Sequence, residues 1–113
     1  MNFMLLFWAP KHLLAAPRSP EQARESGERW HGWADELKEA GHSVTGAQLE
    51  AAGQCVSGAQ KIVAEGAFGC DHLMGGYFIV SASSLEQATE LAKGCPVLQN
   101  GGTVEVRPIM ETD

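Results

Sequence analysis

A few histidines and carboxylates are the groups in this sequence most capable of acid–base chemistry. His31 and Asp35 are four residues apart, the spacing that places two side chains on the same face of a helix. In such a pair the carboxylate can orient the imidazole as a general base. The same spacing is typical of an ion pair on a solvated helix face, and both interpretations stay open.

Three further residues are candidates for the same chemistry. His42 follows Gly41, which is expected to end a helix. There it can line a pocket, or it can interact as a cation with the last carbonyl groups of that helix. Glu50 and Asp71 are the carboxylates most easily paired with a histidine. The catalytic candidates are therefore His31, His42, Glu50 and Asp71.

The run Cys70-Asp71-His72 contains three types of metal ligand in a row. Adjacent side chains in an extended loop point apart, and no second ligand pair accompanies them at a workable spacing. A phosphate-binding loop would need glycines between a strand and the following helix, but Gly75-Gly76 is expected to precede its strand. We therefore expect no metal site and no cofactor.

Two tryptophans could form the wall of a binding site for a planar ligand. Trp30 and Trp33 are three residues apart on an apolar helical stripe, which is equally typical of an ordinary core. If a ligand pocket exists, it is expected between this helix and the sheet. Its lining residues would be Trp30, His31, His42, Phe68 and Asp71, with Glu50 close by.

The elements that must position these residues follow from hydrophobic periodicity and turn signals. Residues 3–8 form an almost continuous apolar run typical of a buried strand, and residues 9–18, with two prolines, are expected to be a loop. Ser19-Pro20 begins a helix that runs to about residue 40. Residues 42–65 are short, glycine-punctuated segments typical of strands or a β-ribbon, and residues 66–74 form a loop.

The last third of the chain repeats the strand–helix–strand order. Residues 77–82 are a strand, and Ser83 and Glu86 have the spacing of a capping box that begins a helix ending near Gly94. Residues 102–110 alternate apolar and polar side chains, which is typical of a strand with one solvent-exposed face. The order βαββαβ predicts an α+β fold with a ferredoxin-like split βαβ arrangement and an antiparallel sheet. The helices leave one apolar sheet face bare, so we expect a homodimer that covers it.

Composition and charge limit the classes of partner. The chain of 113 residues is expected to form one domain, 1–113. Its net charge of −6 and scattered basic residues argue against binding nucleic acid, and its apolar first residues are too few to span a membrane. Three cysteines without CxxC spacing are typical of free thiols in the cytoplasm.

Five stretches of the sequence resemble the YCII-related family, especially its branch with an Asp-Gly-Pro-Phe signature. They are "MNFMLLFW", "ERWHGWADELKEAG", "VTGAQLE", "GGYFIVSASSLEQATELAKGCP" and "GTVEVRPIME". The signature appears here in the altered form Glu65-Gly66-Ala67-Phe68. Trp30 stands where enzyme-like members carry a histidine, with His31 beside it, and Glu50 is the acid nearest the position of the partner aspartate.

The resemblance implies a ferredoxin-like domain paired into a dimeric α/β barrel. It implies no single activity: some members are suspected enzymes with a His and Asp pair, one is linked to dehydrochlorination of an aromatic compound, and some relatives accompany transcription factors. Two functions stay open for this chain. One is a small-molecule binding or sensing domain. The other is a cofactor-free lyase or isomerase that acts on a cyclic or aromatic compound through a histidine–carboxylate pair.

Overall fold

The centre of the molecule is a four-stranded antiparallel sheet. The structure is a computed structural model that describes residues 1–111, except for the side chain of Ala15. The strands are β1 (Asn2–Pro10), β2 (Val44–Gln48), β5 (His72–Ser81) and β6 (Thr103–Pro108). Their order across the sheet is β2-β5-β1-β6, and every neighbouring pair is antiparallel. The predicted α+β class is confirmed, and the strand order is compatible with a ferredoxin-like fold.

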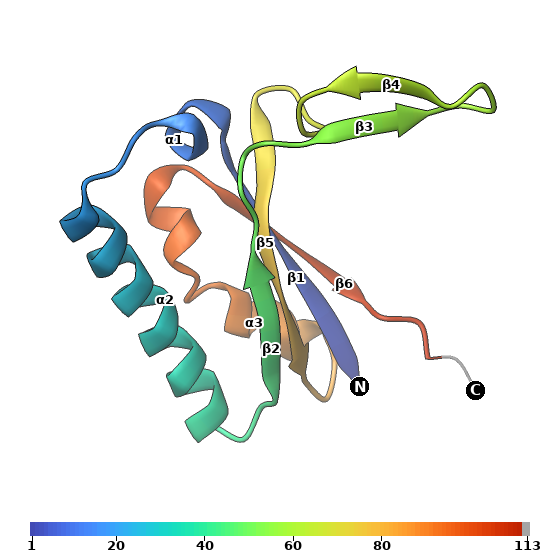
Figure 1. The fold of residues 1–113 in the computed structure, drawn as a ribbon. Coiled ribbons are helices and arrows are strands. Elements are labelled where there is room, and N and C mark those ends of the chain that lie inside the picture. The colour runs from blue at the N-terminus through green and yellow to red at the C-terminus, as the bar shows by residue number, and fades with distance from the viewer. Residues whose placement is uncertain (112–113) are drawn as a thin grey trace.

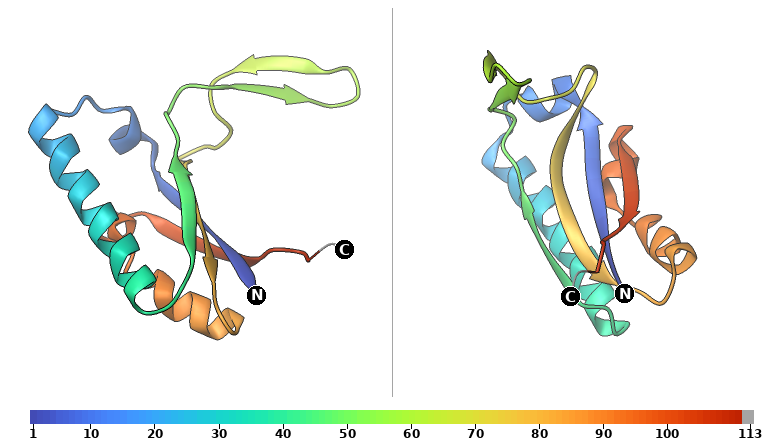
Figure 2. Two further views of the ribbon diagram at one scale, coloured as in Figure 1. Left: turned by 60° about the horizontal axis from the view of Figure 1, so that its bottom comes forward. Right: turned by 90° about the vertical axis from the view of Figure 1, so that its right-hand side faces the viewer.

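The helices lie on one side of this sheet. Helices α2 (Pro20–Glu39) and α3 (Leu85–Ala92) cover one face, while the face that looks away from them carries no helix (Figures 1 and 2). A short 3₁₀ helix, η1 (Pro96–Asn100), connects α3 to β6. None of the helices in the described part of the chain has the length and apolar character needed to cross a bilayer.

The core forms where alternate residues of β1 meet the helices. Side chains from β1, α2 and α3 are buried there: Phe3, Leu5, Phe7, Ala9, Trp33, Leu37, Ala88 and Ala92. Trp33 stacks on Phe78 with ring centroids 5.3 Å apart and packs edge-on against Phe7 at 5.9 Å. Because successive strand residues point to opposite faces, the other half of β1 faces away from this core.

The predicted start of the long helix is confirmed in detail. The Ser19 hydroxyl accepts a hydrogen bond from the backbone amide of Gln22, and the Gln22 side chain accepts one from the backbone amide of Ser19. This reciprocal capping box satisfies two amides that an α-helix leaves free at its first turn. Pro20 follows as the first helical residue, where its missing N–H costs nothing.

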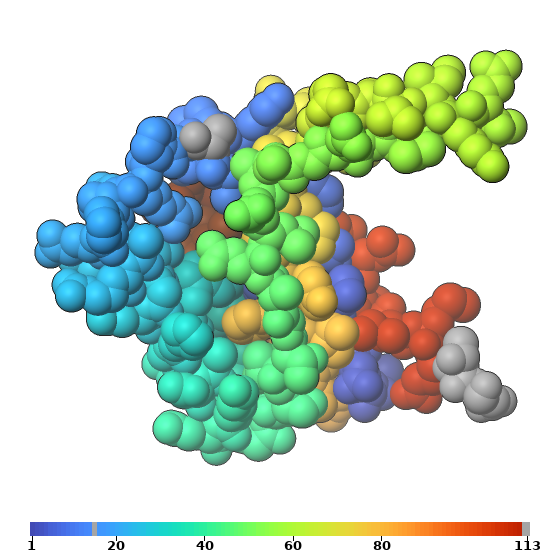
Figure 3. Space-filling view, in the orientation of Figure 1, coloured from blue at the N-terminus to red at the C-terminus, as the bar shows by residue number. Residues whose placement is uncertain are grey.

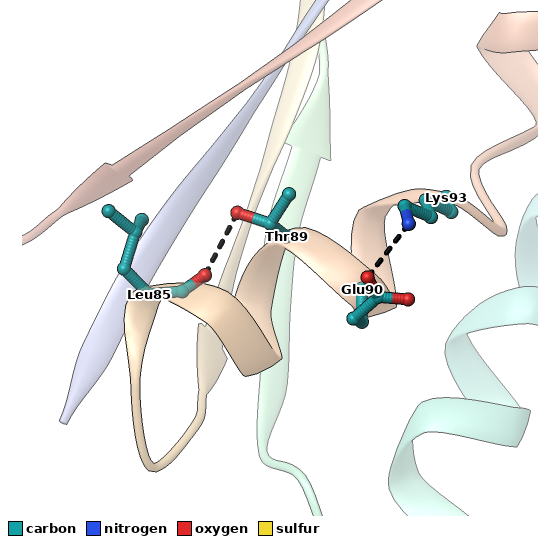
Figure 4. Close-up of polar contacts among 4 residues, drawn as sticks. All are labelled: Leu85, Thr89, Glu90 and Lys93. Atoms are coloured by element: carbon teal, nitrogen blue, oxygen red, sulfur yellow. Dashed lines mark hydrogen bonds and ion pairs between the residues drawn. The ribbon is translucent and has the colours of Figure 1, made fainter.

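The cap of the second helix was predicted one residue too early. Ser84, not Ser83, accepts the hydrogen bond from the Gln87 amide, and the Gln87 side chain rather than that of Glu86 reaches back to Ser83. Within α3 the Thr89 hydroxyl donates to the carbonyl of Leu85, and Lys93, just after the helix, pairs with Glu90 (Figure 4). Both contacts are exposed, so they add little to stability.

The prediction that residues 9–18 form only a loop is wrong. Strand β1 continues to Pro10, and a one-and-a-half-turn helix, α1 (Lys11–Ala15), follows directly. The fixed φ of Pro10, −53° here, suits a residue that leads into a helix. Leu14 of α1 then packs close to Gly75 of β5, so tertiary contact stabilises a helix that is too short to form alone.

The glycine pair lies inside a strand rather than before it. Strand β5 begins at His72 and contains Gly75 and Gly76, so residues 72–74 are not part of the predicted loop. The register between β1 and β5 shifts after Phe7, which faces Gly76, while the next residue, Trp8, faces Met74. Gly75 is therefore the extra residue of a β-bulge. A Cβ at Gly76 would lie 2.8 Å from the Ala47 carbonyl oxygen, which explains the close approach of β2.

A second, two-stranded sheet projects from the body as a hairpin. It consists of β3 (Gln54–Ser57) and β4 (Ile62–Glu65), which pair only with each other. The predicted ribbon is thus confirmed, although Val44–Gln48 belongs to the main sheet. The radius of gyration is 15.5 Å, whereas a compact chain of this length has about 13 Å. The hairpin extends beyond the sheet face opposite the helices (Figures 1 and 2).

We expect the stability of the protein to fall at alkaline pH because of Cys95. Burial raises the pKa of this thiol to about 12, since the thiolate would lose its hydration. Above about pH 8.5 an unfolded cysteine loses its proton while the folded one keeps it. The unfolded state is then favoured, by up to about 1.4 kcal/mol per pH unit until the folded thiol ionises.

Urea unfolding between pH 8 and pH 10.5 measures this dependence. The free energy of unfolding of the wild type should fall more steeply with pH than that of Cys95→Ala, which lacks the ionising group. Equal slopes for the two proteins would contradict the prediction.

Candidate functional site

The sheet face that looks away from the helices is apolar at its centre. Three cross-strand pairs of β1 and β5 carry it: Met4 with Ile79, Leu6 with Tyr77, and Trp8 with Met74. All six side chains are only partly buried. The β-bulge at Gly75 keeps Met74 and Tyr77 on the same face although they are three residues apart. We call these six residues the bare face.

A cavity of about 450 Å³ lies where the bare face meets the base of the hairpin. Figure 3 shows the hairpin standing out from the body above a hollow. The lining residues come from the bare face, the segment after β2 and the segment after β4: Trp8, Leu49, Glu50, Ala52, Ala67, Phe68 and Met74. We call this space the corner cavity. Its volume is within the range of small-molecule sites.

Backbone hydrogen bonds fix the walls of the corner cavity. The Leu49 amide donates to the Gly75 carbonyl at 2.9 Å, and the Gly66 amide donates to the Gly53 carbonyl at 2.8 Å. The first bond ties the segment after β2 to β5, and the second closes the base of the hairpin. The indole Nε1–H of Trp8 donates to Oε1 of Glu105 at 3.1 Å, which orients the ring. Phe68 is 81% exposed.

A second groove, of about 750 Å³, lies at the same end of β1. It is lined by Pro10, Lys11, His12, Cys70, Asp71, His72 and Gly101. The Lys11 amide donates to the Asp71 carbonyl at 2.8 Å, which holds the start of α1 against the segment before β5. Two imidazoles, a carboxylate, a thiol and an ammonium group thus line one open surface. Among the described residues, no three histidine, cysteine or acidic side chains are arranged to hold a metal ion.

The structure divides the predicted site residues among five places. Glu50 and Phe68 lie together in the corner cavity, and Asp71 lies in the second groove. His31 is exposed on α2. Trp30 packs against Phe7 with ring centroids 4.7 Å apart, so aromatic rings occupy the space between α2 and the sheet.

His42 has a structural contact at the opposite end of the sheet. Its Nδ1–H donates to the Ser81 carbonyl oxygen at 2.8 Å, because a carbonyl can only accept. Ser81 pairs with Asn2 at one end of β1, whereas His72, next to Asp71, pairs with Pro10 at the other. Eight steps along a strand separate these ends, about 25 Å. His42 and Asp71 therefore cannot act as a pair within one molecule.

No histidine in residues 1–111 forms an ion pair with a carboxylate; the ion pairs there are Arg24–Glu28 and Lys93–Glu90. His31 and Asp35, on the same helix, are both exposed and do not form the pair that their spacing allows. The described residues therefore show no preformed histidine–carboxylate dyad.

Some lining residues were not anticipated from the sequence. Trp8 and Met74 belong to the corner cavity, and His12 and His72 belong to the second groove. The alternation along residues 3–9 could have identified Trp8, because it has the opposite parity to Phe3, Leu5 and Phe7. Met74 was hidden by the late predicted start of its strand and His12 by the predicted loop, whereas His72 was singled out only as part of the run Cys70-Asp71-His72.

The comparisons with known proteins address the identity of the whole chain. No curated protein is similar enough to the chain to give a match. The model of a family described as "YCII-related domain" matches residues 1–113. The match extends over both sheets and all the helices, including the hairpin that forms the corner cavity. The chain therefore belongs to the YCII-related family, as the resemblance of its sequence predicts.

Proposed function

We propose that this protein is a homodimeric small-molecule binding or sensing domain whose ligand occupies the corner cavity. The observation that carries the proposal is the make-up of the cavity. Trp8, Phe68 and Met74 line it with aromatic and aliphatic side chains, together with one polar side chain, Glu50. Mostly apolar walls with a few polar groups are the usual composition of a small-molecule site. The lack of a preformed dyad in the described residues favours binding over catalysis.

The homodimer accounts for the bare face. A two-layer protein buries the apolar face of each layer, but within the described part of the chain the six bare-face side chains are only partly buried and no helix covers them. A contiguous apolar patch of this kind is typical of an interaction surface. A second copy is the simplest partner, since a two-fold axis lets the same patch cover itself.

A cytoplasmic location is also part of the proposal. Cys55, Cys70 and Cys95 are all free thiols, and Cys70 is exposed, where an oxidising compartment would modify it.

Titration with a neutral aromatic probe, 2-phenylethanol, tests the binding site. We expect the NMR signal of the Trp8 indole N–H to shift, while the Trp33 indole signal stays constant because that ring is buried. Replacing Trp8 by phenylalanine assigns the signal. Phe68→Ala should weaken binding about threefold, because it removes one aromatic wall.

Val56→Ala is the matched control, because Val56 is an exposed apolar residue of the hairpin outside the cavity. It should bind the probe as the wild type does. A Trp8 signal that does not move, or a Phe68→Ala variant that binds normally, would contradict the assignment of the site.

The second groove supports the alternative function, a cofactor-free lyase or isomerase. His12 and His72 line it together with Asp71. Enzymes commonly use an imidazole near a carboxylate to transfer protons. If this groove is the site, the probe should shift the backbone signals of His12 and His72 and leave Trp8 unchanged. The same titration thus separates the two functions.

A further inference from the structure

The charge at the corner cavity is of one sign. Among the described residues that line it, Glu50 is the only ionisable one. Glu50 forms no hydrogen bond or ion pair with another side chain among residues 1–111. A second carboxylate, that of Glu105, accepts the hydrogen bond from the Trp8 indole at the cavity wall. A ligand in this cavity would therefore meet negative charge and two aromatic side chains.

Basic residues in this part of the fold do not line the corner cavity, and Lys11 lines the second groove instead. Arg107 pairs with Met4, four residues along β1 from Trp8, which corresponds to about 13 Å. Lys61 lies in the turn of the hairpin, four residues beyond Glu65 at its base, a similar distance along an extended strand. Among residues 1–111 neither side chain forms an ion pair with Glu50.

We propose that the corner cavity selects an apolar organic cation, such as an aromatic ring that carries an ammonium group. This inference rests on the proposed binding site and adds the chemical class of its ligand. The ammonium group pairs with the Glu50 carboxylate, and the apolar part lies between Trp8 and Phe68. Indole and phenyl rings attract cations through the negative charge of their faces, so both kinds of wall favour the same ligand. An anion would be repelled by Glu50, and a neutral ring would gain only the apolar contact.

The selectivity can be measured with three probes that share one phenyl ring. They are 2-phenylethylamine, which is a cation at pH 7, the neutral 2-phenylethanol, and the anion 3-phenylpropionate. We expect the cation to bind the full-length protein about tenfold more tightly than the alcohol, because it gains the carboxylate and the ring faces together. The anion should bind more weakly than both. The shift of the Trp8 indole signal reports each affinity.

Glu50→Gln keeps the shape of the side chain and removes its charge. We expect it to weaken binding of the cation about three- to fivefold and to leave the affinity for the alcohol unchanged. Glu25→Gln is the control: it makes the same change in net charge on the exposed surface of α2, outside both cavities. It should leave the affinities for all three probes unchanged.

The outcomes separate this inference from the proposed function. If the alcohol shifts the Trp8 signal but the cation binds no more tightly, the proposed ligand class is wrong and the proposed binding site is still supported. The same conclusion follows if Glu50→Gln leaves the affinity for the cation unchanged. If none of the probes shifts the Trp8 signal, the corner cavity is not a ligand site and the proposed function is contradicted. A second copy of the chain would then fill the cavity. Stronger binding of 3-phenylpropionate than of the amine would also overturn the inference.

Discussion

Replacement of Trp33 by alanine is expected to lower the free energy of unfolding by about 3–5 kcal/mol. The Trp33 side chain is 6% exposed and lies at the centre of the aromatic core. It contacts Phe78 and Phe7 from the sheet, and it lies close to Gly94, at the end of α3. Removing it leaves a cavity bounded by both helices and the sheet, so no single element can close the space by a small shift.

Trp30→Ala is the matched comparison and should cost only about 1–2 kcal/mol. Its ring packs against Phe7 and Trp33 but is only partly buried, so less apolar surface is lost from the core. Equilibrium unfolding in urea measures both values. Because the total free energy of unfolding of most natural domains is only about 5–15 kcal/mol, losses of this size are readily detected. A larger loss for Trp30→Ala than for Trp33→Ala would show that the core is centred elsewhere.

The same pair of variants tests whether the tryptophans form a core or a ligand wall. If Trp30 were part of a ligand site, its replacement would change the response to the aromatic probes with little effect on stability. The structure predicts the reverse. Trp30→Ala should lower stability modestly and leave the shift of the Trp8 signal with 2-phenylethanol intact, because the corner cavity lies on the opposite face of the sheet.

Helices and turns whose sequence signals lie within a few residues of one another were predicted well. The long helix has a start signal at Ser19-Pro20 and an apolar stripe with helical spacing, so its place in the chain can be recognised from short-range patterns. The hairpin is similar, because its turn residues lie within a few positions of one another. Such features need no knowledge of distant contacts.

The candidate site depends on contacts between distant parts of the chain, which the sequence does not display. The bulge at Gly75 arises from the pairing of β5 with β1 and the approach of α1. It reverses which residues of β5 face the helices, and Met74 joins Trp8 on the bare face only for that reason. Sequence patterning identified Glu50 and Phe68 as candidates, but it could not place them beside a tryptophan more than forty residues earlier.

Leu6→Glu is expected to convert the proposed homodimer into a monomer. Leu6 lies at the middle of β1, between Tyr77 of β5 and Glu105 of β6. In the dimer a glutamate here would bring a charge into the apolar interface from each copy, next to the carboxylate of Glu105. An unpaired buried charge costs several kcal/mol, and two-fold symmetry doubles that cost. The dissociation constant should rise by roughly a thousandfold or more.

Light scattering at micromolar concentration measures the change in mass, and circular dichroism checks the fold. The Leu6→Glu chain should keep its secondary structure, because the side chain is only partly buried in the single chain and is not part of the helix-facing core. Leu85→Glu is the control. It makes the same substitution at the first residue of α3, on the opposite side of the sheet, where the side chain is 44% exposed and a carboxylate favours the helix start. It should remain dimeric. A wild type that is monomeric at micromolar concentration, or a Leu6→Glu variant that stays dimeric, would rule out the bare face as the interface between copies.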